Sequence, residues 1–162
     1  MTDYIMEMRR FVGHRPLLQA GASVLLEDER GRLLLQRRAD CHLWGYHGGA
    51  VELDEVVEEA AARELFEETG LHAESLELFG VFSGPEMHFV YPNGDEVSNI
   101  DHVYRCTAWT GTPRPQPGEV EELRFFAWDE LPPDEELASM NIPALRAWAA
   151  QKQAERQDGV SE

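Results

Sequence analysis

Residues 56–69 constrain the fold of this chain more than any other segment. The run contains no Gly or Pro, it is rich in Ala, Glu and Leu, and Gly70 follows it directly. Strong helix formers, followed by a glycine that easily adopts the left-handed conformation of a helix end, predict an α-helix here. The fold must therefore offer a surface on which this helix can pack.

The predicted helix and the loop before it carry eight acidic residues between positions 52 and 68 but only one base, Arg63. At about 100° per residue around the helix axis, three carboxylates fall on one side, beside small residues: Glu64, Glu67 and Glu68. Carboxylates four residues apart repel each other, and no lysine lies near enough in the sequence to offset them. The stripe is therefore either an ordinary solvated face or a site for a divalent cation.

The charge of the whole chain excludes several classes of partner. Its 162 residues include 31 Asp and Glu against 14 Lys and Arg, a net charge of −17. General nucleic-acid binding and attachment to anionic membranes both depend on Lys and Arg, so neither partner is expected. With 43% hydrophobic residues, the chain can build a core, and its length predicts a single domain over residues 1–162.

The chain also lacks the marks of export. No apolar run is long enough to span a bilayer, and the first residues show no basic segment followed by an apolar one. The two cysteines, Cys41 and Cys106, form no CxxC pair, so neither a disulfide framework nor a structural zinc site is expected. These features predict a cytoplasmic protein.

Periodicity and turn residues give the expected order of elements. Residues 1–16 form an N-terminal arm with a short helix over 3–12, and residues 20–27 and 32–38 form a β-hairpin. Further strands are expected over 76–82, 87–91, 97–109 and 123–128, with a tight turn at Asn93-Gly94. A last helix covers 143–153, and the tail 155–162 is frayed. Strands flanking two long helices predict an α/β or α+β sandwich.

The spacing around the acidic helix is more specific than its composition. Five residues separate Gly49 from Glu55, and seven more lead to Arg63-Glu64-Leu65-Phe66-Glu67-Glu68-Thr69-Gly70-Leu71. This pattern resembles, position for position, the signature of the Nudix hydrolase family. The resemblance implies an α/β fold, the Nudix-type α/β/α sandwich with a mixed central β-sheet, with residues 17–150 as the catalytic core.

The resemblance also implies an activity and a role for each matched residue. Nudix hydrolases cleave a pyrophosphate bond in a nucleoside diphosphate linked to another moiety, using Mg²⁺ or Mn²⁺. Glu64 and Glu68 would be the main metal ligands, Glu67 would bind directly or through water, and the Gly48 carbonyl would complete the protein ligands. Glu55 and Arg63 would pair and hold the loop against the helix. Mg²⁺ suits such oxygen ligands, with waters and substrate phosphates completing its shell.

Three residues depart from the family pattern. Where members commonly carry Pro, Gly and Ser or Thr, this chain has His47, Asp54 and Val56. Without the usual Ser or Thr cap, Asp54 is expected to cap the helix two residues earlier. His47 is either a bland surface or packing residue or a group that contacts phosphate or responds to pH.

Other candidates lie outside the signature. Arg37 is predicted to face inward, where it could either bind substrate or form a salt bridge with the acidic helix. Similar proteins place a further metal ligand or general base just before the strand that corresponds to 123–128. Three acids lie there, Glu119, Glu121 and Glu122, of which Glu122 is favoured and Glu119 comes second. Two residues give opposite hints about the substrate. Pro85 lies close to where members that cleave ADP-ribose carry a proline, and the segment of Asn141 resembles the place where MutT-like triphosphatases read a purine with Asn. Each also has a plain structural interpretation, as a turn proline and as a helix cap.

Two functions from different classes are consistent with these residues. The first is a metal-dependent Nudix hydrolase with a small nucleotide-derived substrate, either ADP-ribose-like or a nucleoside triphosphate. The second is a catalytically silent Nudix domain that binds a nucleotide as a regulatory module. Silent relatives tend to lose signature glutamates, whereas Glu64, Glu67 and Glu68 are all present, which favours the enzyme. The apolar residues of the N-terminal arm make a homodimer a further expectation.

Overall fold

The central layer of the protein is a mixed five-stranded sheet. The computed structural model describes residues 3–160, without the side chain of Val160. The sheet order is β4 (His47–Ala50), β1 (Leu17–Leu26), β8 (Glu96–Cys106) and β6 (Glu77–Phe82), with β7 (His88–Val90) also pairing with β8. β1 and β8 run parallel, and the other pairs are antiparallel.

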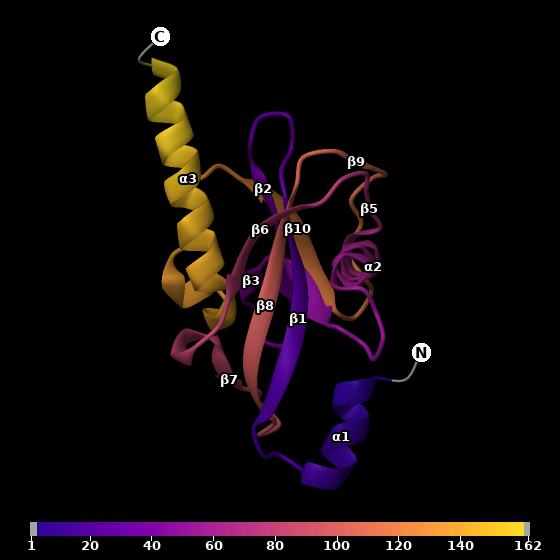
Figure 1. Ribbon diagram of the computed structural model, residues 1–162. Helices are drawn as coiled ribbons and strands as arrows, with labels where there is room; N and C mark the ends of the chain where they lie inside the picture. The colour runs from indigo at the N-terminus through magenta and orange to yellow at the C-terminus, as the bar shows by residue number, and fades with distance from the viewer. Residues whose placement is uncertain (1–2, 161–162) are drawn as a thin grey trace.

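Further strands and helices surround this sheet. β10 (Val120–Phe126), β2 (Leu33–Arg38) and β3 (Trp44–Gly45) form a second sheet, and β5 (His72–Ala73) pairs with β9 (Trp109–Thr110). The two long helices, α2 (Val57–Thr69) and α3 (Ile142–Val160), lie on opposite sides of the sheets, and α1 (Tyr4–Val12) lies near one end of β1 (Figure 1). Short 3₁₀ turns η1 (Pro85–Met87), η2 (Asp134–Glu136) and η3 (Ser139–Asn141) complete the order. The predicted α/β sandwich is confirmed.

The predicted hairpin of residues 20–27 and 32–38 is wrong. β1 pairs with β4 and β8, whereas β2 pairs with β10 and β3, and the two strands share only the bridge between Glu27 and Leu33. Both strands contain unbroken buried runs, residues 21–26 in β1 and 33–36 in β2. A strand buried on both faces belongs inside a layered structure and has neighbours on both sides, unlike a two-stranded ribbon with one solvated face.

Most of the other elements agree with the sequence. The Asn93-Gly94 turn is present, with the Tyr91 N–H donating to the Asp95 carbonyl at 2.7 Å and Gly94 at φ 92°. The last helix runs to Val160 instead of ending at residue 153, so residues 155–160 of the tail are helical, while 161–162 lie outside the described residues. Within residues 3–160, no helix has the length and apolar character that crossing a membrane requires.

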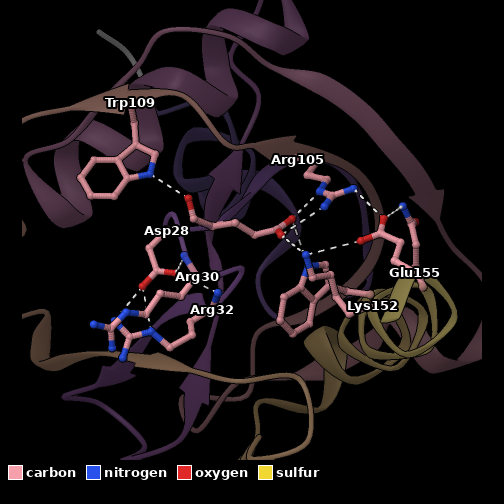
Figure 2. A network of polar contacts seen from close by, with 10 residues as sticks. Asp28, Arg30, Arg32, Arg105, Trp109, Lys152 and Glu155 are labelled. Carbon is pink, nitrogen blue, oxygen red and sulfur yellow. Dashed lines mark hydrogen bonds and ion pairs between the residues drawn. The ribbon is translucent and has the colours of Figure 1, made fainter. Parts of the chain in front are cut away.

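One buried carboxylate joins the central sheet to α3. Glu27, at the end of β1, is 2% exposed and accepts hydrogen bonds from Arg105 of β8 and from Lys152 and Trp148 of α3. Figure 2 shows Arg105 and Lys152 converging with Glu155, and Trp109 approaching from the other side. Burial raises the pKa of Glu27, but the hydrogen bonds from Arg105, Lys152 and Trp148 outweigh burial and lower it. Glu27 is therefore ionised at neutral pH.

Removing this carboxylate should destabilise the fold. In Glu27→Ala, Arg105 and Lys152 lose their shared buried partner, and breaking such an ion pair costs about 3–5 kcal/mol. We expect the free energy of unfolding in urea at pH 7 to fall by about that amount. The matched control is Glu29→Ala, which removes an exposed carboxylate two residues away and should change stability little. Equal stability of the two variants would contradict the role given to Glu27.

Candidate active site

Arg63 organises the start of α2. Its Nε and one terminal nitrogen donate to the two oxygens of Glu55 at 2.8 and 3.0 Å, and the same nitrogen reaches the Ala50 carbonyl at 3.2 Å. The other terminal nitrogen donates to Glu64 at 2.9 Å and approaches Glu67 at 3.4 Å. This two-point pairing with a carboxylate uses the planar geometry of guanidinium. Arg63 thus ties the loop after β4 to the helix, as the sequence predicted.

Two carboxylates one helical turn apart face β4. Glu64 packs over Gly49, where a Cβ atom would lie 2.5 Å from the Glu64 carboxyl carbon. Glu68 accepts hydrogen bonds from the Gly48 N–H at 3.1 Å and from the Gln36 amide at 3.2 Å. Burial raises the pKa of Glu64 to about 7, and the negative charge of Glu68 adds to the shift. The pair is therefore unfavourable when both groups are charged without a cation.

The donor set fits a hard divalent ion, although a complete cage is not preformed. In residues 3–160, no three His, Cys, Asp or Glu side chains are already arranged as a metal site. Glu67 is exposed and contacts Arg63. Two neighbouring carboxylates, with space left by Gly49, match the way Mg²⁺ binds, through one or two carboxylates, several waters and substrate phosphates. The Gly48 carbonyl remains a predicted ligand, since the contact described for Gly48 is its N–H to Glu68.

His47 is a buried residue behind these carboxylates. Its side chain is fully buried, Nε2 lies 3.1 Å from the Leu34 carbonyl, and Nδ1 lies 3.7 Å from Glu68. A carbonyl can only accept, so Nε2 carries a proton. The packing interpretation of His47 is confirmed, because the ring fixes β4 against β2. The surface interpretation is wrong.

Two neighbouring cavities lie on this side of the molecule, and Glu68 lines the first of them. The first, of about 410 Å³, is largely polar and is lined by Glu68, Gln36, Arg38, Glu119 and residues of α1. The second, of about 250 Å³, is more apolar and lies over Tyr46, Phe89, Asp101, Met140 and Asn141. Both are lined by Arg38, Gly48 and Gly49. A polar cavity beside a more apolar one suits a ligand with a charged part and a flat ring.

Comparison with known proteins agrees with this geometry. The family model of the NUDIX domain matches residues 17–147. A MutT-like protein from Streptomyces ambofaciens is 46% identical over 120 residues, which cover 74% of this chain and 68% of that protein. The chain belongs to the Nudix hydrolase family.

Two further relatives extend this Nudix assignment. The oxidized purine nucleoside triphosphate hydrolase of Danio rerio is 30% identical over 115 residues, covering 68% of this chain and 67% of the relative. The crystal structure of a MutT NUDIX hydrolase from Burkholderia pseudomallei superposes with a TM-score of 0.67 at 32% identity, covering 80% of this chain and 97% of that one. The Nudix fold and family are therefore shown over most of the chain.

The cap predicted for the Nudix helix is wrong. Val56 is the N-cap residue of α2 and makes no side-chain hydrogen bond there, while Asp54 has φ 62°. Asp54 thus occupies the left-handed region, which glycine adopts freely and Asp tolerates better than most residues. Asp54 replaces the family's glycine in its backbone conformation instead of capping the helix. The Glu52 N–H is satisfied by Glu55 at 3.1 Å.

Two of the candidates outside the signature lie away from the cavities. Arg37 pairs with Glu121 of β10 at 3.4 Å and with the His42 carbonyl at 3.4 Å, instead of with the acidic helix. Its neighbour Arg38 lines both cavities. Glu122 forms an ion pair with Arg124, whereas Glu119, the less favoured acid, lines the first cavity. Arg37 and Arg38 are neighbours in β2, and strand alternation sends neighbouring side chains to opposite faces. Glu119 lies in the turn before β10, whereas Glu122 lies within that strand.

The two residues that suggested a substrate, Pro85 and Asn141, lie in different places. Pro85 is exposed and begins η1, so its turn interpretation is the one that the structure supports. Asn141 lines the second cavity, and its side-chain oxygen accepts a hydrogen bond from the Tyr46 N–H at 3.1 Å. Asn141 therefore links η3 to the strand segment before β4. Two aromatic residues, Phe89 and Tyr91, also line this cavity.

Several residues of the site were not predicted from the sequence. Gln36 supports Glu68, and Asn99 and Asp101 form part of the second cavity. In β8, buried and partly exposed residues alternate from Glu96 to Tyr104, and Asn99 and Asp101 occupy buried positions of this pattern. Two polar residues on the buried face of a strand were the signal that could have identified them.

Proposed function

We propose that this Nudix protein is a divalent-metal-dependent pyrophosphohydrolase that cleaves a nucleoside triphosphate. The observation that carries the proposal is the pair of neighbouring cavities, in which Glu68 lines the more polar cavity and Asn141 lines the more apolar one. Arg38 borders both, where it can contact phosphate oxygens between the metal and the base. Its pairing with Asp40, at 3.1 and 2.9 Å, fixes the guanidinium.

Each residue of the candidate active site has a defined task in this proposal. Glu64 and Glu68 would hold Mg²⁺ or Mn²⁺, which would neutralise phosphate charge and activate the attacking water. Gln36 and the Gly48 N–H orient Glu68, and Arg63 holds the loop that follows β4. Glu119 is one of the acids that line the first cavity, and it would accept a proton from water there.

A triphosphate is favoured over an ADP-ribose-like substrate by two observations. Asn141 lies in the apolar cavity while Pro85 is exposed at η1. The names of two of the relatives, a MutT-like protein and an oxidized purine nucleoside triphosphate hydrolase, agree with this choice. A cavity of about 250 Å³ also suits one ring system better than a second sugar.

The proposed activity is tested by incubating the protein with a panel of substrates and identifying the products. The purified chain is incubated with the four dNTPs, ADP-ribose and a dinucleoside polyphosphate, each with Mg²⁺, Mn²⁺ or EDTA, and products are separated by ion-exchange chromatography. We expect a dNTP to yield the monophosphate and pyrophosphate, with no turnover in EDTA. Turnover of ADP-ribose alone would overturn the triphosphate assignment. Nucleotide binding without turnover of any substrate would favour the silent regulatory module.

A further inference from the structure

A third cavity lies away from the candidate active site. Its volume is about 320 Å³, and it shares no lining residue with the two cavities described above. Three parts of the chain form it: the turn between β1 and β2, the segment that follows β10, and the C-terminal half of α3. Residues 30–32 therefore meet residues 152–156 here, so the cavity is a product of the fold and not of one charged stretch of sequence.

Four of the chain's 14 basic residues line the third cavity. Arg30 and Arg32 come from the turn, while Lys152 and Arg156 lie one helical turn apart on α3. In a chain with a net charge of −17, such a concentration of positive charge is the opposite of the average surface. Cations held close together repel each other, so the cluster costs free energy unless anions lie among them.

Asp28 holds the turn in place. Its carboxylate accepts hydrogen bonds from the N–H groups of Arg30 and Arg32 at 3.0 and 2.8 Å, and the Arg32 guanidinium donates to it at 2.8 Å (Figure 2). Between the two arginines, Gly31 has φ 73°, and a Cβ atom there would lie 3.0 Å from Lys152 Nζ. The turn conformation and the missing side chain thus let the turn approach α3.

Two of the four cations already have partners in the protein. Arg32 forms an ion pair with Asp28 at 2.8 Å, and Lys152 forms one with buried Glu27 at 2.7 Å. Both cations are therefore held in fixed positions at the wall of the cavity. Lys152 carries three N–H donors and Arg32 carries five, so each can still donate to a ligand.

The other two cations, Arg30 and Arg156, are unpaired. Both are exposed, and within residues 3–160 neither side chain forms a hydrogen bond or an ion pair. Of the two acids that line the cavity, Glu155 is engaged by Lys152 at 3.5 Å, whereas Asp129 pairs with no cation in this part of the chain. Two free guanidinium groups against one free carboxylate leave an excess of positive charge in the third cavity.

We propose that the third cavity binds the diphosphate group of a small phosphorylated molecule. Guanidinium groups match phosphate oxygens in geometry as well as in charge. Arg30 and Arg156 lie on different walls, the turn and α3, so each can contact one of two linked phosphoryl groups. The inference is independent of the proposed function, because this site shares no residue with the candidate active site and needs no metal.

The size and surroundings of the cavity favour a small ligand. Nucleic acids bind through many cations along an extended surface, whereas these four lie within about 320 Å³ and the rest of the chain is strongly acidic. Free pyrophosphate and the diphosphate of a nucleotide present the same oxygens to the arginines. Trp128, which is partly buried and also lines the cavity, would add affinity for a nucleotide by stacking on its base.

Calorimetry in EDTA tests this site apart from any hydrolysis. Pyrophosphate, ADP and inorganic phosphate are each titrated into the full chain at low salt. Without metal, the carboxylates of α2 repel these anions, which disfavours binding at the candidate active site. We expect pyrophosphate to bind more tightly than inorganic phosphate, and its affinity to fall as salt is raised.

Variants of the free charges locate the binding. Arg30→Gln/Arg156→Gln should weaken pyrophosphate binding by about tenfold or more, since a hydrogen bond to a charged group is worth about that factor. The matched control, Arg10→Gln/Arg15→Gln, also removes two exposed arginines, but neither lines any of the three cavities. Asp129→Asn removes the unpaired carboxylate and should tighten binding, a gain that damage to the fold would not produce.

The choice of ligand identifies the source of the diphosphate. Tighter binding of ADP than of pyrophosphate would assign the site to a nucleotide, and Trp128→Leu should then remove the difference, while equal or weaker binding of ADP would assign it to free pyrophosphate. Inorganic phosphate bound as tightly as pyrophosphate, or unchanged affinity in the double variant of Arg30 and Arg156, would overturn the inference. That variant should keep wild-type turnover in the substrate panel, so the two proposals fail separately.

Discussion

Glu68→Gln should lower kcat by about 100-fold or more, because even residues that only support a metal ligand typically contribute 10–100-fold. Glu68 is held by the Gly48 N–H and the Gln36 amide. The glutamine keeps the shape of the side chain but removes the negative charge that would bind Mg²⁺. The Gly48 N–H and the Gln36 amide both donate to the same oxygen of Glu68, so the amide oxygen of the glutamine can keep both hydrogen bonds. The measurement is steady-state turnover of the best dNTP at saturating Mg²⁺.

The matched control for this experiment is Glu122→Gln. It makes the same chemical change on β10, where Glu122 pairs with Arg124 at the surface, and should retain wild-type turnover. Thermal unfolding of the metal-free proteins should show that both variants keep the fold. In fact, the removal of one charge from the Glu64–Glu68 pair relieves repulsion and should not lower the stability of metal-free Glu68→Gln. Near-normal kcat in this variant would refute the ligand assignment.

Local spacing explains why so much of the catalytic helix could be predicted. α2 begins and ends within a residue of the prediction, and Gly70 has the expected left-handed conformation at φ 75°. The pairing of Arg63 with Glu55 spans eight residues, so loop and helix geometry alone bring them together. Such features depend on neighbours in sequence, which a pattern can describe.

The errors have a different physical origin. Strands β1 and β2 are adjacent in sequence but join different sheets, because each pairs with a strand that lies 80 or more residues further on, β8 for β1 and β10 for β2. Asn99 and Asp101 reach the site only through the parallel pairing of β8 with β1, and Gln36 reaches Glu68 across 32 positions. The helix cap predicted at Asp54 was wrong for a local reason. An aspartate at this position suggested a cap, but its φ of 62° is a backbone conformation typical of glycine. Long-range pairing and backbone conformation were the missing information.

Gly49→Ala is the second change expected to have a large effect, because it acts on a metal ligand without altering any charge. A Cβ atom at this position would lie 2.5 Å from the carboxyl carbon and one oxygen of Glu64. Carbon atoms cannot approach so closely, so the carboxylate or the β4 backbone must move by about an ångström, a displacement that can cost about 100-fold in rate. We therefore expect kcat with a dNTP to fall by about that factor.

A comparison of binding and turnover tests whether displacement of Glu64 is the cause. The affinity of metal-free protein for dGMP should change little in Gly49→Ala, whereas the apparent affinity for Mg²⁺ in the turnover assay should fall with kcat. Gly159→Ala, in α3 with open space around it, is the matched control and should behave like the wild type. Full turnover in Gly49→Ala would show that Glu64 can move away without loss, and would remove Glu64 from the ligand set. Loss of Mg²⁺ affinity with an intact fold would instead show that the space left by the missing side chain at Gly49 is needed for Glu64 to bind the metal.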